Sequence, residues 1–248
     1  MKLSAIKSLG AAAVLTASAL FMATPAAHAD TFTFTSTDAE AIFTTSNGSV
    51  LVQLFSLDPN PTSAGVLLSG ITFTLSGSGF TQGTITPVAT APDGLVTING
   101  GVGTADTSDS INHWGSSVSG SNVCLATSTL SCTLGGQPHD LIIDPGPGTH
   151  PYSNANPSIS NHDPDIVTEG DFILNIAGIT VTSGKTDGTS ISGVTFDFGT
   201  GSGDLAPEPG TLSGPNNPPS VPEPSSLFLL GTGILGAAGM LRRKMFGA

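Results

Sequence analysis

The residues with the richest chemistry gather in one polar stretch late in the chain. It reads Asn161-His162-Asp163-Pro164-Asp165 and continues to Glu169 and Asp171, so four carboxylates fall within nine residues. Carboxylate oxygens are the ligands that Ca²⁺ prefers, which makes Asp163, Asp165, Glu169 and Asp171 candidate calcium ligands. The spacing is not that of an EF-hand, which needs glycine at position six and glutamate at position twelve. The alternative is a solvated acidic loop that precedes a strand.

Histidines around the same stretch allow a second metal hypothesis. His139, Asp144, His150 and His162 are of the residue types that bind Zn²⁺. No H-x-x-x-H pair on a helix frames them, so zinc rests on residue type alone. The sequence establishes no cofactor, and calcium is the candidate that these acidic residues allow.

Trp114 and Tyr152 are the single Trp and the single Tyr of the chain. Aromatic rings stack on sugars, and together the two residues form a candidate ligand platform. The alternative is that a lone Trp in a β protein serves as a core residue or loop anchor.

Signals for catalysis are sparse. No G-x-S-x-G elbow occurs, and a Ser-His-Asp set drawn from five histidines carries no information without geometry. Paired glycosidase carboxylates meet in space and not in sequence, so a polysaccharide-active hydrolase stays open as an alternative. We expect that the protein is not an enzyme and assign no catalytic residue.

The two cysteines, Cys124 and Cys132, are expected to form a disulfide in an exported chain. Such a bridge would pin a small hairpin or loop, and the entropy model gives it about 2–3 kcal/mol.

The elements that must position these residues are strands. Thr31-Phe32-Thr33-Phe34-Thr35 alternates strictly, Ser46-Asn47-Gly48-Ser49 is a turn, and Val194, Phe196 and Phe198 share one face of a segment from 191 to 198. Gly100 to His113 lacks periodicity and is predicted to be a loop. The pattern predicts an all-β domain over residues 30–204, an antiparallel two-sheet sandwich of jelly-roll-like or immunoglobulin-like type.

The first 29 residues have the layout of a secretory signal peptide. Lys2 and Lys7 precede an apolar run, and Ala27-His28-Ala29 forms an A-x-A cleavage site that places the mature start at Asp30. Signal peptidase and the export machinery are therefore expected partners.

The other end is a Pro/Gly-rich linker, 205–220, followed by a tail, 221–248. The tail holds Pro222-Glu223-Pro224, an uncharged run over 225–241, and the basic cluster Arg242, Arg243 and Lys244. Seventeen helical residues span about 25 Å, which predicts one short C-terminal transmembrane helix. Under the positive-inside rule the basic cluster stays cytoplasmic and the body lies outside the inner membrane.

This order of triplet, short Gly-rich apolar run and basic cluster resembles the PEP-CTERM sorting signal of Gram-negative bacteria, a segment also labelled an ice-binding protein C-terminal domain. The resemblance covers about 27 residues and leaves the body unassigned. It implies an exosortase as partner, transient anchoring in the inner membrane, and delivery to the cell surface or extracellular matrix.

Charge excludes one class of partner. Between Asp30 and Ser220 there are 17 acidic residues against the single cation Lys185, a net charge of −16. Nucleic-acid binding needs clustered Lys and Arg, so it is set aside. The sequence therefore predicts an exported surface or matrix protein with a structural or adhesive role and exopolysaccharide as a candidate ligand. The rival hypotheses are a surface hydrolase and a passive domain with a calcium-binding loop.

Overall fold

The computed structural model describes residues 29–81, 83–85, 87–127, 138–144, 152, 157–181, 188–200 and 205–213, with residues 83–85 described by their backbone alone. Alternation of apolar and polar residues sets the fold, because Phe32 and Phe34 of the first strand are buried while the threonines between them face outward. The first strand begins at Asp30, the residue at which we expect the mature chain to start.

The strands of the described residues are, in chain order, β1 (Asp30–Thr35), β2 (Ala39–Ser46), β3 (Ser49–Ser56), β4 (Leu68–Leu75), β5 (Gly83–Ile85), β6 (Val88–Thr90), β7 (Leu95–Asn99), β8 (Val102–Asp106), β9 (Trp114–Ser119), β10 (Asn122–Thr127), β11 (Ile142–Ile143), β12 (Asp165–Val167), β13 (Glu169–Asn175), β14 (Ile191–Phe198), β15 (Glu208–Pro209) and β16 (Thr211–Leu212). The described residues also include two short 3₁₀ helices, Ala64–Val66 and Ile159–Asn161.

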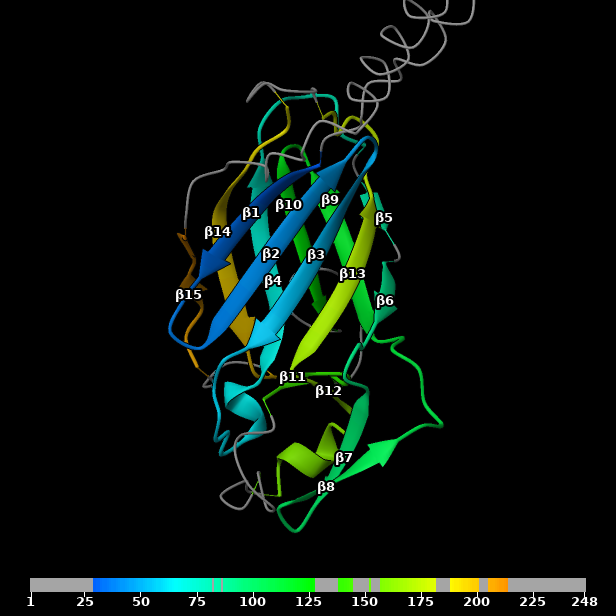
Figure 1. Ribbon diagram of the computed structural model, residues 1–248, viewed down its shortest axis with the longest axis vertical. Coiled ribbons are helices and arrows are strands. Elements are labelled where there is room, and N and C mark those ends of the chain that lie inside the picture. The colour runs from blue at the N-terminus through cyan, green and yellow to red at the C-terminus, as the bar shows by residue number, and fades with distance from the viewer. Residues whose placement is uncertain are drawn as a thin grey trace, which may run out of the picture. The chain divides into compact units, whose positions relative to one another are not determined.

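These strands form two sheets. Sheet A has the order β16-β1-β2-β3-β13-β6, and sheet B runs β5-β9-β10-β4-β11-β12-β7-β8, with β14 pairing with β4 and with β15. In Figure 1, β1, β2, β3 and β13 form the layer nearer the viewer, and β14, β4, β10 and β9 lie behind them. The predicted all-β fold with two sheets is confirmed, and the finer jelly-roll-like or immunoglobulin-like assignment stays a prediction.

The main core lies between the sheets. Phe43 of sheet A packs against Phe73 of sheet B with ring centroids 4.9 Å apart, and Phe172 packs against Trp114 at 4.4 Å. All four side chains are buried. Because aromatic pairs add to the free energy of burial, these contacts join the two layers.

A second, smaller core lies at the end of the sandwich where β7, β8, β11 and β12 meet (Figure 1). Its buried residues are Ala64, Leu67, Val96, Ile98, Leu141, Ile143, Tyr152 and Ile159. This end core supports the polar stretch that the sequence singles out.

The segment 205–213, which we call the strap, corrects the predicted linker boundary. Its strand β15 pairs with β14 of sheet B, and its strand β16 pairs with β1 of sheet A. The compact unit accordingly ends at Gly214, and not at residue 204 as the composition predicts. The reason is physical: Gly210 packs so closely on Phe34, Val194 and Phe196 that an added Cβ would lie 3.1–3.2 Å from their side chains.

The predicted loop Gly100–His113 contains strand β8, which pairs with β7 in a hairpin, so that prediction is wrong in part. Among the described residues no helix is long and apolar enough to cross a membrane. The predicted transmembrane run 225–241 lies outside the part of the chain that the structure describes.

Candidate functional site

The four predicted calcium ligands separate into two pairs. Glu169 and Asp171 lie two residues apart on β13 and both accept hydrogen bonds from the Gln53 amide, at 2.8 and 3.2 Å. Burial first, and then the adjacent Asp171 carboxyl, raises the pKa of Glu169. Asp163 and Asp165 lie instead beside the end core, where Asp163 accepts the Ile98 amide through both oxygens. The structure therefore does not bring all four carboxylates into one calcium site.

Asp165 is the most unusual of the four. Its side chain is completely buried, and neither carboxyl oxygen has a hydrogen-bond partner. Burial raises its pKa well above the usual value for Asp, and the charges of Asp163 and Asp140 raise it further. A buried carboxyl without a partner is costly when ionised, so this environment favours the neutral acid.

Asp140 organises the chain around it. Its Oδ2 atom accepts the backbone N–H of Asn112 at 3.1 Å and of His113 at 3.0 Å, and lies 3.0 Å from Nδ1 of His113. Its backbone carbonyl accepts the indole N–H of Trp114 at 2.8 Å. Its Oδ1 atom is buried and has no partner. Asp140 thus holds the start of β9 in place and fixes the ring of His113.

The rings of three histidines, His113, His139 and His162, lie near one another at this end of the domain. The ring centroids of His113 and His139 lie 4.8 Å apart, and those of His139 and His162 lie 6.2 Å apart. Nδ1 of His139 lies 3.1 Å from the Asp163 carbonyl, and Nδ1 of His162 lies 2.6 Å from the Pro138 carbonyl. A carbonyl only accepts, so both Nδ1 atoms donate and the neutral rings keep their lone pair on Nε2.

The cluster of His113, His139, His162 and Asp140, which we call the His–Asp cluster, fixes the orientation of its imidazole rings through these hydrogen bonds. The zinc hypothesis named two of its histidines, His139 and His162, but not His113, which the structure adds; His150 lies outside the described residues. Within the described ranges, no group of three or more His, Cys, Asp or Glu side chains is arranged to hold a metal ion. The cluster as it stands is a hydrogen-bonded anchor of the loops at this end of the sandwich.

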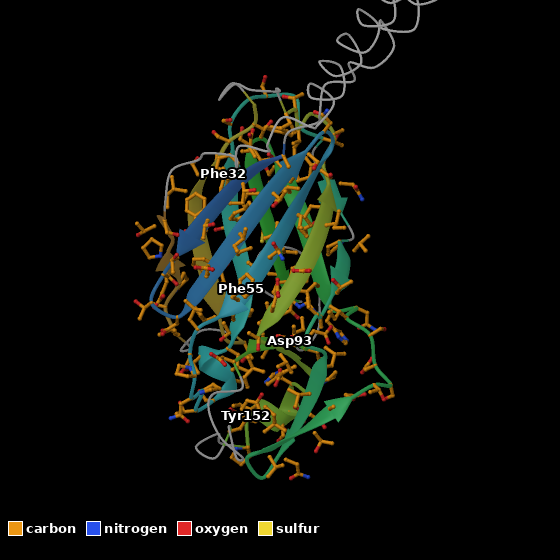
Figure 2. All side chains as sticks on the ribbon, in the orientation of Figure 1. Phe32, Phe55, Asp93 and Tyr152 are labelled. Carbon is orange, nitrogen blue, oxygen red and sulfur yellow. The ribbon has the colours of Figure 1, made fainter. Side chains whose placement is uncertain are left out.

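The predicted ligand platform of Trp114 and Tyr152 is wrong. Trp114 is 3% exposed in the main core, and Tyr152 is 2% exposed in the end core. In Figure 2, Tyr152 lies at the lower end of the domain, beside the β7–β8 hairpin. Burial raises the pKa of Tyr152 to about 12, with smaller effects from Asp165 and Asp144. Trp114 is a core residue, as the alternative interpretation of a lone Trp predicts, and Tyr152 is also a core residue.

The outer face of sheet B presents a different surface, lined by small polar side chains. By register, Ser117, Cys124, Thr72 and Thr195 form one row across β9, β10, β4 and β14, and Ser119, Asn122, Thr74 and Ser192 form the next. A hollow of about 250 Å³ lies over part of these rows, next to Gly193. We call it the hydroxyl groove. Its hydroxyl and amide groups can both donate and accept hydrogen bonds, and its lining residues carry no charge.

Cys124 lines this groove, and the part of the chain that the structure describes holds no free cysteine. Cys132 lies outside the described residues, so the Cys124–Cys132 disulfide stays a prediction.

The comparisons with known proteins concern the far end of the chain. Residues 220–244 match the family model described as the PEP-CTERM protein-sorting motif. The chain carries a PEP-CTERM sorting motif. The match spans the predicted triplet Pro222-Glu223-Pro224, the apolar run and the cluster Arg242, Arg243 and Lys244, all of which lie outside the described residues. Residues 1–28 of the predicted signal peptide, 1–29, also lie outside them. No curated protein and no solved structure matches the chain.

The PEP-CTERM motif implies an exosortase as the processing partner and export to the cell envelope or surface. The motif was readable from sequence because its three parts are contiguous. His113, Asp140 and the hydroxyl groove were missed because each depends on strand pairing. One sequence signal was available for the groove, the alternation of Thr with apolar residues over 71–75 and of Ser with Val over 117–119.

Proposed function

We propose that this protein is a non-catalytic structural or adhesive component of the cell surface or extracellular matrix, released from a transient membrane anchor by an exosortase. The observation that carries the proposal is the PEP-CTERM motif at 220–244, which follows a folded β domain that ends at Gly214. Before processing, the tail holds the body outside the inner membrane. Afterwards the acidic domain remains at the surface or in the matrix.

We assign the adhesive role to the hydroxyl groove, with an uncharged exopolysaccharide as the ligand. Sugar hydroxyls pair with groups that donate and accept, and Thr72, Thr74, Ser117 and Asn122 supply such groups on one face. The body carries a net charge of −16 and repels polyanions. A neutral glycan is therefore the polymer that fits both the groove and the charge.

The distribution of acids supports a non-catalytic role. Glu169 and Asp171 lie on one strand and share the Gln53 amide, whereas glycosidase carboxylates face each other across the scissile bond. The buried Trp114 and Tyr152 offer no sugar-stacking wall to such a reaction.

Sorting is tested with the full chain in a host with and without an exosortase, by measuring the intact mass and the location of the mature protein. We expect loss of the tail near the Pro222-Glu223-Pro224 triplet in the competent host alone. An intact tail in both hosts would contradict exosortase processing and leave a plain membrane-anchored domain.

Adhesion is tested by co-sedimentation of the mature domain with insoluble cellulose as a neutral glycan and with calcium alginate gel as an anionic one. The double variant Thr74→Ala/Asn122→Ala removes a hydrogen-bonded pair of the groove, whose side-chain oxygens are 3.1 Å apart. We expect the native domain to co-sediment with cellulose and not with alginate. The double variant should bind cellulose at least fivefold more weakly than the native domain does. The control Thr44→Ala lies on the outer face of sheet A and should bind as the native protein does. Equal binding by all three proteins would refute the groove as the binding surface.

A further inference from the structure

The sequence contains the Pro-Glu-Pro triplet twice. One copy is Pro222-Glu223-Pro224, inside the sorting motif, and the other is Pro207-Glu208-Pro209, fifteen positions upstream. Both are followed by small residues, Gly210-Thr211 in one case and Ser225-Ser226 in the other. A sorting enzyme that reads a short extended triplet must distinguish them.

The upstream triplet belongs to the strap and is tied into the folded domain. The Glu208 carboxylate accepts the backbone N–H of Thr37 at 3.2 Å and of Asp38 at 3.3 Å. Strand β15 pairs Glu208 with Phe196 and Pro209 with Thr195. Directly after the triplet, the Gly210 amide donates to the Val194 carbonyl at 2.9 Å.

The residues that follow hold the strap from the other side. Thr211 and Leu212 pair with Thr35 and Phe34 of β1, and the Ser213 amide donates to the Thr33 carbonyl at 2.9 Å. Gly210 packs against Phe196, Val194 and Phe34, so the strap is fixed to both sheets at once. The triplet itself therefore has partners in β14 and in the turn between β1 and β2, and the strap residues after it have partners in β1.

We propose that the fold withholds the upstream Pro207-Glu208-Pro209 triplet from the exosortase, so that processing occurs only at Pro222-Glu223-Pro224. The inference rests on the proposed exosortase processing and adds the device that selects the processing site. The triplet is not hidden by burial, because Pro207 and Pro209 are exposed. The enzyme cannot bind the triplet because its backbone is paired with β14 and its Glu208 carboxylate is already hydrogen-bonded within the domain.

The physical basis is that a peptidase binds its substrate as an extended, unpaired segment. Chain that is engaged in a sheet becomes available only through local unfolding, and its exposure falls with the free energy of that opening. Detaching the strap breaks the hydrogen bonds above and uncovers Phe34 and Phe196, which are 5% and 0% exposed. The released form is therefore rare while the domain is folded.

The test uses the full chain in an exosortase-competent host, with intact mass of the mature protein as the readout. The first variant replaces Pro222, Glu223 and Pro224 with alanine. The second adds Gly210→Val, which crowds the strap, and Thr211→Pro, which removes the backbone N–H at the position paired with Thr35, while residues 207–209 stay unchanged. The third carries the strap changes alone, with the downstream triplet intact. Hydrogen exchange at the Ser213 amide confirms that the strap is released.

The native chain should be cut near 222–224, the first variant should stay uncut, and the second should be cut near 207–209. The third should be cut at both triplets, which shows that the strap variant is exported and recognised. Cleavage of the first variant at the upstream triplet would overturn the proposal. The proposal would also be overturned if the second variant stayed uncut while the third was cut only near 222–224. In that case a released upstream triplet is still not cut, and its distance from the apolar run would be the feature that selects the site. An uncut native chain would instead refute exosortase processing itself.

Discussion

Asp165 shows at the scale of one residue how burial sets the behaviour of an acid. Both of its oxygens are buried without a partner, and the carboxyls of Asp163 and Asp140 stand close enough to raise its pKa further. Its folded-state pKa lies above its unfolded value. At low pH the carboxyl is protonated in both states, and between the two pKa values only the folded state keeps the proton. Its contribution to stability is therefore lost as pH rises from about 4 through the folded pKa.

Replacing Asp165 with asparagine should flatten this pH dependence. The free energy of unfolding, measured by urea titration from pH 4 to pH 8, should fall less steeply in Asp165→Asn than in the native domain. The matched control is the exposed Asp109→Asn, whose curve should run parallel to the native one. Parallel curves for native protein and Asp165→Asn would show that Asp165 titrates normally in the fold.

Asp140 tests the opposite case, a buried carboxylate with partners. In Asp140→Ala the amides of Asn112 and His113 and the His113 ring lose their acceptor. Because three part-buried hydrogen bonds are lost together, we expect a loss of about 3 kcal/mol in the free energy of unfolding, measured with urea at pH 7. Asp109→Ala should cost less than about 0.5 kcal/mol. A small effect of Asp140→Ala would mean that water replaces the carboxylate.

At this scale the sequence shows which residue types are present, but it does not show which residues they contact in the folded protein. The acidic stretch predicted one calcium site from Asp163, Asp165, Glu169 and Asp171, and the structure places these residues in two separate pairs. His113 and Asp140 meet although they are 27 positions apart in the sequence, and no local pattern predicts such a contact. Trp114 was misread because a lone aromatic residue carries no sign of which face of a strand it occupies until the register is known.

At the scale of elements, alternation and turn residues were sufficient for the well-patterned strands. The Phe/Thr alternation of β1 and the Asn47-Gly48 turn between β2 and β3 are where the sequence predicts them, with Gly48 at a φ of 79° that favours glycine. Strand β8 was missed because apolar and polar residues do not alternate in Val102–Asp106, and its burial in the structure does not alternate either. The strap was missed because its prolines and glycines have the composition of a linker.

The β9–β10 hairpin carries the prediction about the disulfide. Under non-reducing conditions the mature domain should resist alkylation, and reduction should lower its free energy of unfolding by about 2–3 kcal/mol. The measurement is intact mass after alkylation, followed by urea titration with and without reductant. The double variant Cys124→Ser/Cys132→Ser should be insensitive to reductant. Full alkylation without reduction would refute the bridge.

At the scale of the whole molecule, the boundary between domain and linker can be measured directly. A chain of residues 30–204 lacks the strap and leaves Phe34 and Phe196 uncovered, whereas a chain of residues 30–214 keeps it. We expect the shorter chain to melt about 10 °C lower, from a loss on the order of 3 kcal/mol. A chain of residues 30–220 should melt with 30–214. Equal melting of all three would place the boundary at 204.

The pairing of β1 with β16 also has a consequence in time. The Ser213 hydroxyl donates to the Thr33 carbonyl, and the two residues are 180 positions apart in the sequence. Strand β1 leaves the export channel early, so it can pair with β16 only after almost all of the domain has been exported. Until residue 213 has emerged, the Phe34 edge of sheet A has no neighbour on that side. Completion of the fold thus coincides with arrival of the sorting tail at the membrane, and the chain is presented to its processing enzyme as a finished domain.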